Sequence, residues 1–290
     1  MIDRRSFVIG AGALAAGCMG YPGESRRARA DFRGLRQSLG PGARLGVAAL
    51  DTGSGRWLVH DEDGRYAMAS TFKAGLAGAI LAEVEAGRLA LDQEIAFTRA
   101  DLVSHAPVVE AALDRGRLPV ERLCAAIVEV SDNAAANLLL ARIGGPEGLT
   151  RFFRRCGDPI TRLDRMETAL NSNLPGDPRD TTTPRAMVGT LKALLIDGPL
   201  GPASRAKLHG WMEGATTGLG RLRAGLPHGW RIGDKTGNGA NGAANDIAFA
   251  YPPGRAPILI ACYQSGGNAD GAMRDAVHAS VARAVASAFL

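Results

Sequence analysis

Strand-forming sequence lies at the two ends of this 290-residue chain, and helical sequence fills the middle. RLGVAAL (44–50) and RWLVH (56–60) flank the turn sequence DTGSG, a pattern that predicts a β-hairpin. Strand patterns return near the C-terminus, in WRIGDKTG, NDIAFAYPP and PILIACYQS. The economical solution is one five-stranded antiparallel sheet built from both ends of the chain and flanked by helices.

The central part of the sequence predicts a separate helical lobe. From Ser70 to about Leu208 apolar residues recur at helical spacing, and Gly87 marks one helix end as a C-cap. Residues 162–183 show little periodicity, so we expect a long ordered loop there. The predicted fold class is thus α+β or α/β with two lobes and a cleft at their junction. The lobes comprise residues 31–65 plus 213–290 (α/β) and residues 66–212 (all-α).

The first 30 residues predict an export signal. A charged start, MIDRRSF, precedes a short apolar stretch, and ARA at 28–30 offers a small-residue cleavage site. The pair Arg4-Arg5 followed by Ser-Phe resembles a twin-arginine signal, and the alternative is an ordinary leader that contains two arginines. LAAGC resembles a lipobox ending at Cys18, so lipoprotein anchoring is a second alternative. Either way, we expect an exported protein, periplasmic or secreted.

The charge distribution argues against a nucleic-acid partner, and the cysteine spacing argues against a metal ion. The net charge is +5, of which the leader carries +3 from five arginines against Asp3 and Glu24. The remaining +2 is spread over 260 residues without a basic cluster, which argues against nucleic-acid binding. Beyond Cys18 the cysteines are odd in number and lack metal-ligand spacing, so we expect no metal and either one disulfide or three buried thiols. They are Cys124, Cys156 and Cys262.

Three short motifs contain side chains of the kind that take part in catalysis. In Ser70-Thr-Phe-Lys73 the serine and lysine lie three residues apart on a predicted helix, so the ammonium can reach the hydroxyl. A helix N-terminus also offers free backbone N–H groups that suit developing negative charge. Lysine differs from arginine here because it can give up its proton, and the chain has only four lysines among its 34 basic residues.

The other two motifs are Ser131-Asp132-Asn133, between two predicted helices, and Lys235-Thr236-Gly237, at a strand end. Each has a structural alternative. Ser, Asp and Asn are good helix caps, and a lysine before a turn is commonly a solvated edge residue. Two of the four lysines fall in these motifs, however, and each motif pairs a hydroxyl with a cation or an amide.

In their order along the chain, the three motifs resemble the set found in class A serine β-lactamases and penicillin-binding proteins. Further segments are similar to the class A family over about residues 31–290. Arg165-Met-Glu167-Thr-Ala-Leu-Asn171 matches the pattern of that family's omega loop, and GDPRDTTTP closes it. TTG at 216–218 and RAGLP at 223–227 are also similar. The resemblance implies a β-lactamase/transpeptidase-like fold, an omega loop at 162–180 and a pairing of Arg165 with Asp180.

The resemblance also implies catalytic roles. Ser70 would attack the lactam carbonyl and form an acyl-enzyme. Lys73 is one candidate base for that step, and Glu167 acting through a water held with Asn171 is the other; the sequence does not decide between them. Glu167 would activate water for deacylation. Ser131 would pass a proton to the departing lactam nitrogen, supported by Lys235.

Binding roles are implied in the same way. Lys235 and Thr236 would meet the substrate carboxylate, and Asn133 would bind its acylamide side chain. The backbone N–H groups of Ser70 and Asn238 would form the oxyanion hole. The implied substrates are small β-lactam antibiotics, with no cofactor, and the implied state is a monomer.

Several positions depart from common family patterns. His105 stands where many members carry an aromatic residue, and Asn238 stands where smaller residues are commoner. A carboxylate-binding arginine is lacking on the strand after Lys-Thr-Gly, and Arg221 resembles the arginine that some members supply from elsewhere. We favour Arg221 as an anion partner over a structural surface arginine. Ala69 and Gly239 exclude the disulfide found next to the serine in some carbapenem-hydrolysing relatives, which disfavours strong carbapenem activity.

Two rival functions remain at this point. A penicillin-binding D-Ala-D-Ala peptidase shares the three motifs but does not need a water-activating glutamate in the loop. A slow-turnover β-lactam sensor would acylate and stay acylated. Arg165, Glu167 and Asn171 together favour the hydrolytic enzyme, and hence antibiotic resistance, over both rivals.

Overall fold

The computed structural model describes residues 27–29 and 31–290, so most of the predicted export signal, with Arg4, Arg5 and Cys18, lies outside the described residues. The main sheet has the strand order β1-β3-β2-β10-β9-β8. Five of these strands are antiparallel neighbours, as predicted from the sequence. A sixth strand, β1, pairs in parallel with β3 and was not predicted. The strands are β1 (Arg27–Arg29), β2 (Arg44–Asp51), β3 (Arg56–His60), β8 (Arg231–Asn238), β9 (Ala244–Tyr251) and β10 (Ile258–Ser265).

The turn sequence explains the β2–β3 hairpin. The Asp51 Oδ1 accepts the Gly53 N–H at 3.0 Å, and the Asp51 carbonyl accepts the Gly55 N–H at 2.8 Å, so the chain reverses within DTGSG. Strand β10 then pairs with β2 along its whole length, with Cys262 opposite Val47. This pairing brings the two ends of the chain into one sheet.

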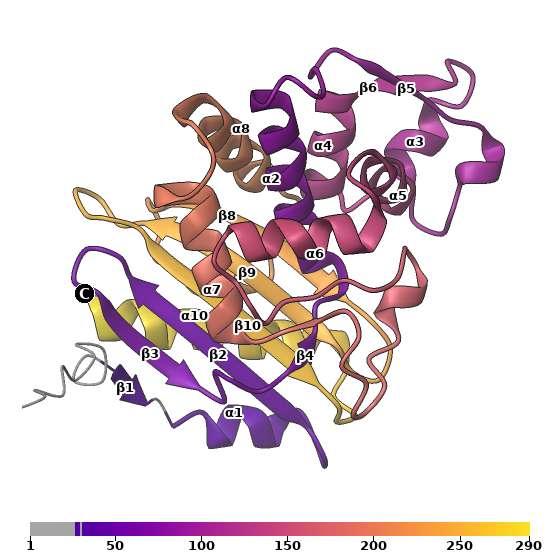
Figure 1. Cartoon of the computed structure of the whole chain (residues 1–290). Helices are drawn as coiled ribbons and strands as arrows, with labels where there is room; N and C mark the ends of the chain where they lie inside the picture. The colour runs from indigo at the N-terminus through magenta and orange to yellow at the C-terminus, as the bar shows by residue number, and fades with distance from the viewer. Residues whose placement is uncertain (1–26, 30) are drawn as a thin grey trace, which may run out of the picture.

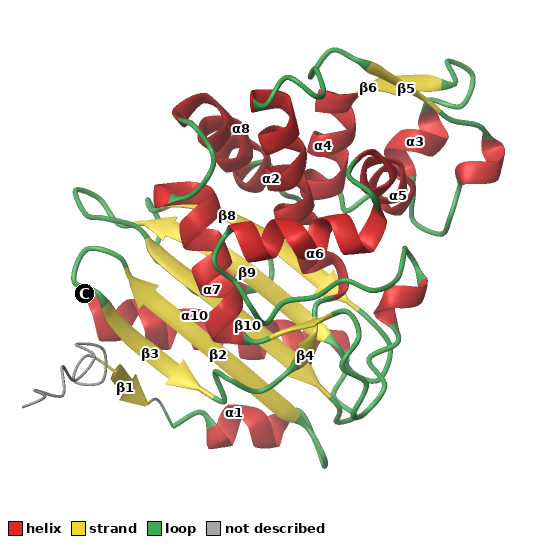
Figure 2. Ribbon diagram, in the orientation of Figure 1, coloured by secondary structure: helices red, strands yellow, loops and turns green. Residues whose placement is uncertain are grey.

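Helices cover both faces of the sheet (Figures 1 and 2). One face packs against the terminal helices and α9, through a core that includes Val47, Ile260 and Val281. The other face carries α7 and, beyond it, the helical lobe. The covering helices are α1 (Arg33–Ser38), α7 (Pro184–Lys192), α9 (Leu222–Gly225) and α10 (Gly271–Phe289). The sheet strand β2 is buried over Leu45–Leu50 because both of its faces are covered.

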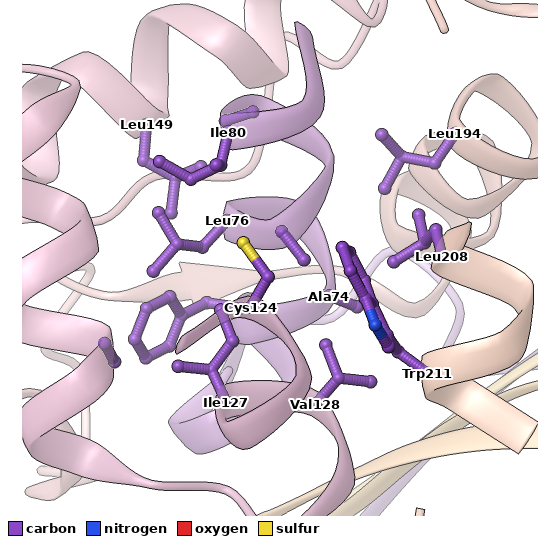
Figure 3. Close-up of a cluster of buried hydrophobic side chains, with 14 of the residues drawn as sticks. Ala74, Leu76, Ile80, Cys124, Ile127, Val128, Leu149, Leu194, Leu208 and Trp211 are labelled. Atoms are coloured by element: carbon purple, nitrogen blue, oxygen red, sulfur yellow. The ribbon is translucent and has the colours of Figure 1, made fainter. Parts of the chain in front are cut away.

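The central lobe is built around one buried helix, α2 (Phe72–Glu85), in which every residue from Phe72 to Leu81 is buried. A helix that is buried on all sides must have neighbours all round it. Figure 3 shows Leu76 of α2 beside Cys124 and Ile127 of α4, with Trp211 of α8 next to Ala74. The other helices of this lobe are α3 (Pro107–Ala111), α4 (Val120–Glu129), α5 (Asn133–Arg142), α6 (Gly145–Arg155) and α8 (Pro202–Glu213).

The central lobe differs from the all-α expectation in two respects. It contains two short two-stranded sheets, β4–β7 and β5–β6. Helix α7, which falls inside the range 66–212, packs on strands β2 and β10 and so belongs to the sheet layer. The short elements are β4 (Tyr66–Ala67), β5 (Glu94–Ala96), β6 (Arg117–Pro119), β7 (Thr181–Thr182), the 3₁₀ helices η2 (Ala69–Thr71), η3 (Arg99–Asp101) and η4 (Ala169–Asn171), and the π-helix η5 (Ala193–Asp197).

Residues 162–180, the predicted omega loop, form a long segment whose one helical turn is η4. Among the described residues the cysteines Cys124, Cys156 and Cys262 are free thiols. In the part of the chain that the structure describes, no helix is both long and apolar enough to cross a membrane.

Candidate active site

A cavity of about 270 Å³ opens where the two lobes meet, as the sequence predicted. Its walls come from the turn η2, the segment before α3, the connection between α4 and α5, the omega loop, the segment after α8 and the end of β8. Most of the predicted site residues line it. The lining residues are Ser70, His105, Ser131, Asn133, Asn171, Thr217, Thr236, Gly237 and Asn238.

Ser70 lies in η2, the 3₁₀ turn that leads directly into α2. The Lys73 Nζ donates to the Ser70 Oγ at 3.0 Å, as the helical spacing predicted. On the other side, the Ser70 Oγ lies 3.4 Å from the Glu167 Oε1. The hydroxyl is therefore held between an amine and a carboxylate.

Lys73 is fully buried and is surrounded by oxygen atoms. Its Nζ lies 3.0 Å from the Glu167 Oε1, 2.5 Å from the Asn133 Oδ1 and 2.8 Å from the Ser131 carbonyl oxygen. Burial lowers the pKa of Lys73 because the charged form is desolvated, and the Glu167 carboxylate opposes this shift. A lysine with a lowered pKa can exchange a proton with a neighbouring hydroxyl.

Glu167 is held at both its backbone and its side chain. Asn137 accepts the Glu167 N–H and donates to its carbonyl oxygen, both at 2.9 Å. The Asn171 Nδ2 donates to the Glu167 Oε2 at 2.7 Å. The Asn171 Oδ1 is buried and has no partner among the described residues, so it can accept a hydrogen bond from a small molecule in the cavity.

Asn137 was missed by the sequence reasoning. Its spacing was the one signal in the sequence: Asn137 lies four residues after Asn133, so the two asparagines lie on the same face of α5. An isolated asparagine in a helix does not show what it contacts, and its partner Glu167 is 30 residues away.

Ser131 connects the two buried lysines. Its Oγ accepts from the Lys235 Nζ at 3.1 Å and from the Lys73 Nζ at 3.3 Å. Ser131 adopts a φ of 62°, a left-handed conformation that is uncommon for residues other than glycine and is concentrated at functional sites. Burial and the nearby charge of Lys73 lower the pKa of Lys235 to about 7.

Asp132, the middle residue of the Ser131-Asp132-Asn133 motif, caps a helix. The Asp132 Oδ1 accepts the Ala135 N–H at 2.8 Å, which caps α5. Its Oδ2 accepts the Val108 N–H at 2.8 Å, which ties the start of α3 to the same point. The structural interpretation of Ser131-Asp132-Asn133 as a helix cap therefore applies to Asp132, while Ser131 and Asn133 line the cavity.

Strand β8 presents the last predicted motif to the cavity. A Cβ atom added to Gly237 would lie 3.1 Å from the Ser70 backbone nitrogen, so the strand end packs closely against the start of the Ser70 turn. The Thr236 Oγ1 lies 2.8 Å from the Thr217 Oγ1, and both threonines line the cavity. Thr217 belongs to the TTG segment and was given no role from the sequence.

Arg221 lies behind β8 and does not line the cavity. It is buried, and its guanidinium donates to Asp275 at 2.7 Å, to the Asn245 carbonyl at 2.8 Å and to the Asn238 Oδ1 at 2.6 Å. Arg221 is therefore not a surface arginine, and its predicted direct contact with a substrate anion stays a prediction. His105 lines the cavity, and its Nε2 lies 2.8 Å from the Val130 carbonyl oxygen.

The predicted pairing of Arg165 with Asp180 is confirmed, with 2.5 Å between the Arg165 Nε and the Asp180 Oδ2. The Asp180 Oδ1 accepts the backbone N–H groups of Asp164 and Arg165 at 2.7 and 2.9 Å. The carboxylate thus closes the omega loop at its base. Among the described residues, no group of three or more His, Cys, Asp and Glu side chains could hold a metal ion.

Comparisons with known proteins agree with this arrangement. The sequence matches the beta-lactamase enzyme family over residues 30–289. It is 47% identical to beta-lactamase AST-1 of Nocardia asteroides, over 89% of this chain and 83% of that protein. It is 45% identical to the carbapenem-hydrolyzing beta-lactamase KPC of Klebsiella oxytoca, over 87% and 85%.

The solved structures show the same similarity. The class A beta-lactamase of the last common ancestor of Gram-negative bacteria superposes with a TM-score of 0.87 at 51% identity, covering 89% of this chain and 98% of that one. The fold and the site define a class A β-lactamase. The chain belongs to that family.

Proposed function

We propose that the protein is a serine β-lactamase that opens the lactam ring of penicillins and cephalosporins through an acyl-enzyme on Ser70. The observation that carries the proposal is the position of the Ser70 hydroxyl, 3.0 Å from the Lys73 Nζ and 3.4 Å from the Glu167 Oε1. A hydroxyl becomes an effective nucleophile when a neighbouring group can take its proton. The names of the relatives, all beta-lactamases, support the same activity.

Two groups in this site can act as the general base for acylation, Lys73 and Glu167. Lys73, buried and with a lowered pKa, can take the proton directly because it touches the hydroxyl. Glu167 can take it directly or through a water that also contacts Asn171. Either route is general-base catalysis, which typically contributes about 10²- to 10⁴-fold to a rate.

Ring opening requires a proton for the departing lactam nitrogen. The Ser131 Oγ accepts hydrogen bonds from both Lys73 and Lys235, which occupy its two lone pairs. Its own O–H is then directed away from both ammonium groups and can donate to the nitrogen. Proton transfer from Lys73 or Lys235 would restore the Ser131 hydroxyl.

Deacylation distinguishes a hydrolase from the two rival functions. A peptidase or a slow-turnover sensor has no need of a second base beside the nucleophile. Here Glu167 is clamped by Asn137 and Asn171, and the free Oδ1 of Asn171 is available to orient a water beside it. This arrangement supports turnover, with the water attacking the acyl carbonyl as Glu167 takes its proton.

Substrate recognition follows from the polar groups that remain. The Lys235 ammonium and the Thr236 hydroxyl would bind the substrate carboxylate, and Asn133 would bind the acylamide side chain. The backbone N–H groups of Ser70 and Asn238 would form the oxyanion hole, where such donors contribute about 3 kcal/mol each to lowering the barrier. Asn238 would also face the amide side chain.

The decisive experiment is hydrolysis of a chromogenic cephalosporin by the purified protein. We expect many turnovers per molecule, with penicillins hydrolysed as well. A single acylation event per molecule, seen as a burst without a steady state, would contradict the proposal in favour of a peptidase or a sensor.

We also propose that the protein acts outside the cytoplasm as a monomer. Support comes from the leader sequence, whose charged start, apolar stretch and small-residue site are typical of export signals. N-terminal sequencing of the protein from a periplasmic fraction should find cleavage after residue 30 or, for a lipoprotein, an acylated Cys18. Light scattering on the mature chain should give the mass of one copy.

A further inference from the structure

A second cavity, of about 570 Å³, is lined in part by omega-loop residues, among them the run from Ser172 to Arg179. The loop forms one wall, and the ends of the main sheet form the others. Asn173 of the loop spans the gap at one side, donating to the Asn241 carbonyl at 2.9 Å and to the Ser265 Oγ at 3.0 Å. Cavities of roughly 300–1,000 Å³ are of the size that holds small ligands.

The residues that line this cavity carry a net positive charge. Four arginines line it, and Asp177 is the carboxylate among its lining residues, which gives a net charge of +3 (four minus one). The arginines come from three separate parts of the chain, so the charge gathers only in the folded protein. They are Arg44, Arg65, Arg165 and Arg179.

Three of the arginines have a carboxylate partner. Arg44 pairs with Asp61 at 3.0 Å, Arg165 pairs with Asp180, and Arg179 pairs with Asp177 at 2.9 Å. For Arg65, no carboxylate of the described residues lies within salt-bridge distance. Its guanidinium donates only to neutral oxygens, those of Thr181 at 3.1 Å and of the Ile160 carbonyl at 3.4 Å.

An unsatisfied polar atom marks the same cavity. The Oγ of Ser172, one of the lining residues, is buried and has no hydrogen-bond partner in the described part of the chain. A buried hydroxyl without a partner is costly, and such groups are normally satisfied by a ligand or a water. Among the residues that the structure describes, Arg65 is exposed and has no ion pair, and the Ser172 Oγ is unsatisfied, so both groups are available to a ligand that is rich in acceptor oxygens.

We propose that this cavity is a binding site for a small polyanion that carries phosphate groups, with Arg65 as its principal cation and the Ser172 hydroxyl as a donor. Arginine suits such a ligand because its planar guanidinium donates two parallel hydrogen bonds to phosphate oxygens. The paired arginines Arg44 and Arg179 add to the positive field and can share their donors with the ligand.

Binding here is coupled to the candidate active site by the chain itself. Asn171 lines the active-site cavity, and the next residue, Ser172, lines the second cavity. The Asn171 carbonyl accepts the Ala240 N–H at 2.8 Å, so displacement of Ser172 also strains this contact. A ligand that pulls on Ser172 therefore shifts Asn171 and, through it, Glu167. This consequence rests on the proposed function, whereas the binding itself does not.

The test uses tripolyphosphate as the probe and isothermal calorimetry on the purified protein. We expect one site per molecule, with a dissociation constant that rises with salt because the attraction is electrostatic. Arg65→Gln should weaken binding about tenfold or more, which corresponds to loss of a charge-assisted contact. Arg99→Gln, the same change in η3 of the other lobe, should leave the constant unchanged.

Two further measurements separate the outcomes. Tripolyphosphate should lower kcat for a chromogenic cephalosporin without raising KM, whereas purely competitive inhibition would place the probe at Lys235 and overturn the proposal. Equal affinity in wild type and Arg65→Gln, or no binding heat, would also overturn it. Ser172→Ala supplies the same test if Arg65→Gln does not fold, with an expected loss of affinity of severalfold. The calorimetry requires no turnover, so it fails or succeeds independently of the enzymatic proposal.

Discussion

At the scale of the residue, the choice of lysine over arginine explains the chemistry of the site. The two buried lysines, Lys73 and Lys235, are both in the site, while the two others, Lys192 and Lys207, are partly exposed and paired with carboxylates. An arginine would stay charged at any accessible pH. Burial lowers the pKa of a lysine toward neutrality, so only lysine can serve there as a proton carrier.

Glu167→Gln should slow deacylation while the acyl-enzyme on Ser70 still forms. Glutamine preserves the shape, but its single acceptor oxygen can keep only one of the two contacts that Lys73 and Asn171 make with Glu167, and it cannot take a proton from water. We expect deacylation to slow by two or more orders of magnitude, consistent with loss of a general base. Mass spectrometry should then show acyl-enzyme accumulating on Ser70. Rapid turnover by this variant would remove Glu167 from its assigned role.

Lys235 should make substrate capture sensitive to pH. Its pKa is lowered to about 7, so its ammonium is present below that pH and is lost as the pH rises above it. Binding of a substrate carboxylate needs the charge, so kcat/KM should fall on the alkaline side of about pH 7. Lys235→Arg keeps its charge, and its profile should lose this alkaline fall. Identical profiles for the two proteins would contradict the assignment.

At the scale of the element, the omega loop is a segment held at its base and at its middle. Asp180 fastens the base through the Arg165 side chain and two backbone N–H groups. Asn137 of α5 fastens the middle through the backbone of Glu167. Because the loop has little regular structure of its own, its position and that of the Glu167 carboxylate depend on such side-chain contacts.

Asp180→Asn should therefore loosen the loop while leaving the fold intact. Asparagine tolerates the left-handed backbone at this position, where φ is 58°, but it removes the charge that faces Arg165. We expect faster hydrogen exchange over residues 162–180 and a lower rate of deacylation. The matched control is Asp197→Asn, which breaks an exposed pair with Lys192 and should change neither quantity. Unchanged exchange in Asp180→Asn would show that other contacts hold the loop.

At the scale of the whole molecule, the two lobes share one hydrophobic core. The core that surrounds α2 also includes Phe249 and Tyr263 of the sheet and Leu191 of α7. The lobes are thus not independently folded units, and we expect them to unfold together. The active site lies along this shared boundary, so its geometry depends on the packing of both lobes.

Leu76→Ala tests this shared core. Leu76 is completely buried near the centre of α2, and truncation of such a residue typically costs about 2–5 kcal/mol. Urea unfolding followed by fluorescence and by circular dichroism should show one transition at a lower midpoint with both probes. Leu174→Ala is the control, because Leu174 is 51% exposed and should change the midpoint little. Two separate transitions would contradict a shared core.

The sequence alone was enough for most of the local structure and for choosing the candidate reacting groups. Periodicity predicted the five antiparallel strands, the helical middle and the long loop, because side-chain burial repeats with each element's own period. The spacing of Ser70 and Lys73 predicted their contact, because three residues make nearly one helical turn. Strand β1 was not predicted, because three residues lying inside an export-like leader carry no strand pattern.

Only the tertiary structure decided which distant groups meet. The structure shows that Asn137 holds the backbone of Glu167 and that Arg221 is buried and donates to Asn238, while its contact with a substrate anion stays a prediction. The arginine-lined cavity at the omega loop likewise has no signature in the sequence. Contacts between residues far apart in the chain depend on how helices and strands pack, and packing is a property of the whole core that no local pattern records.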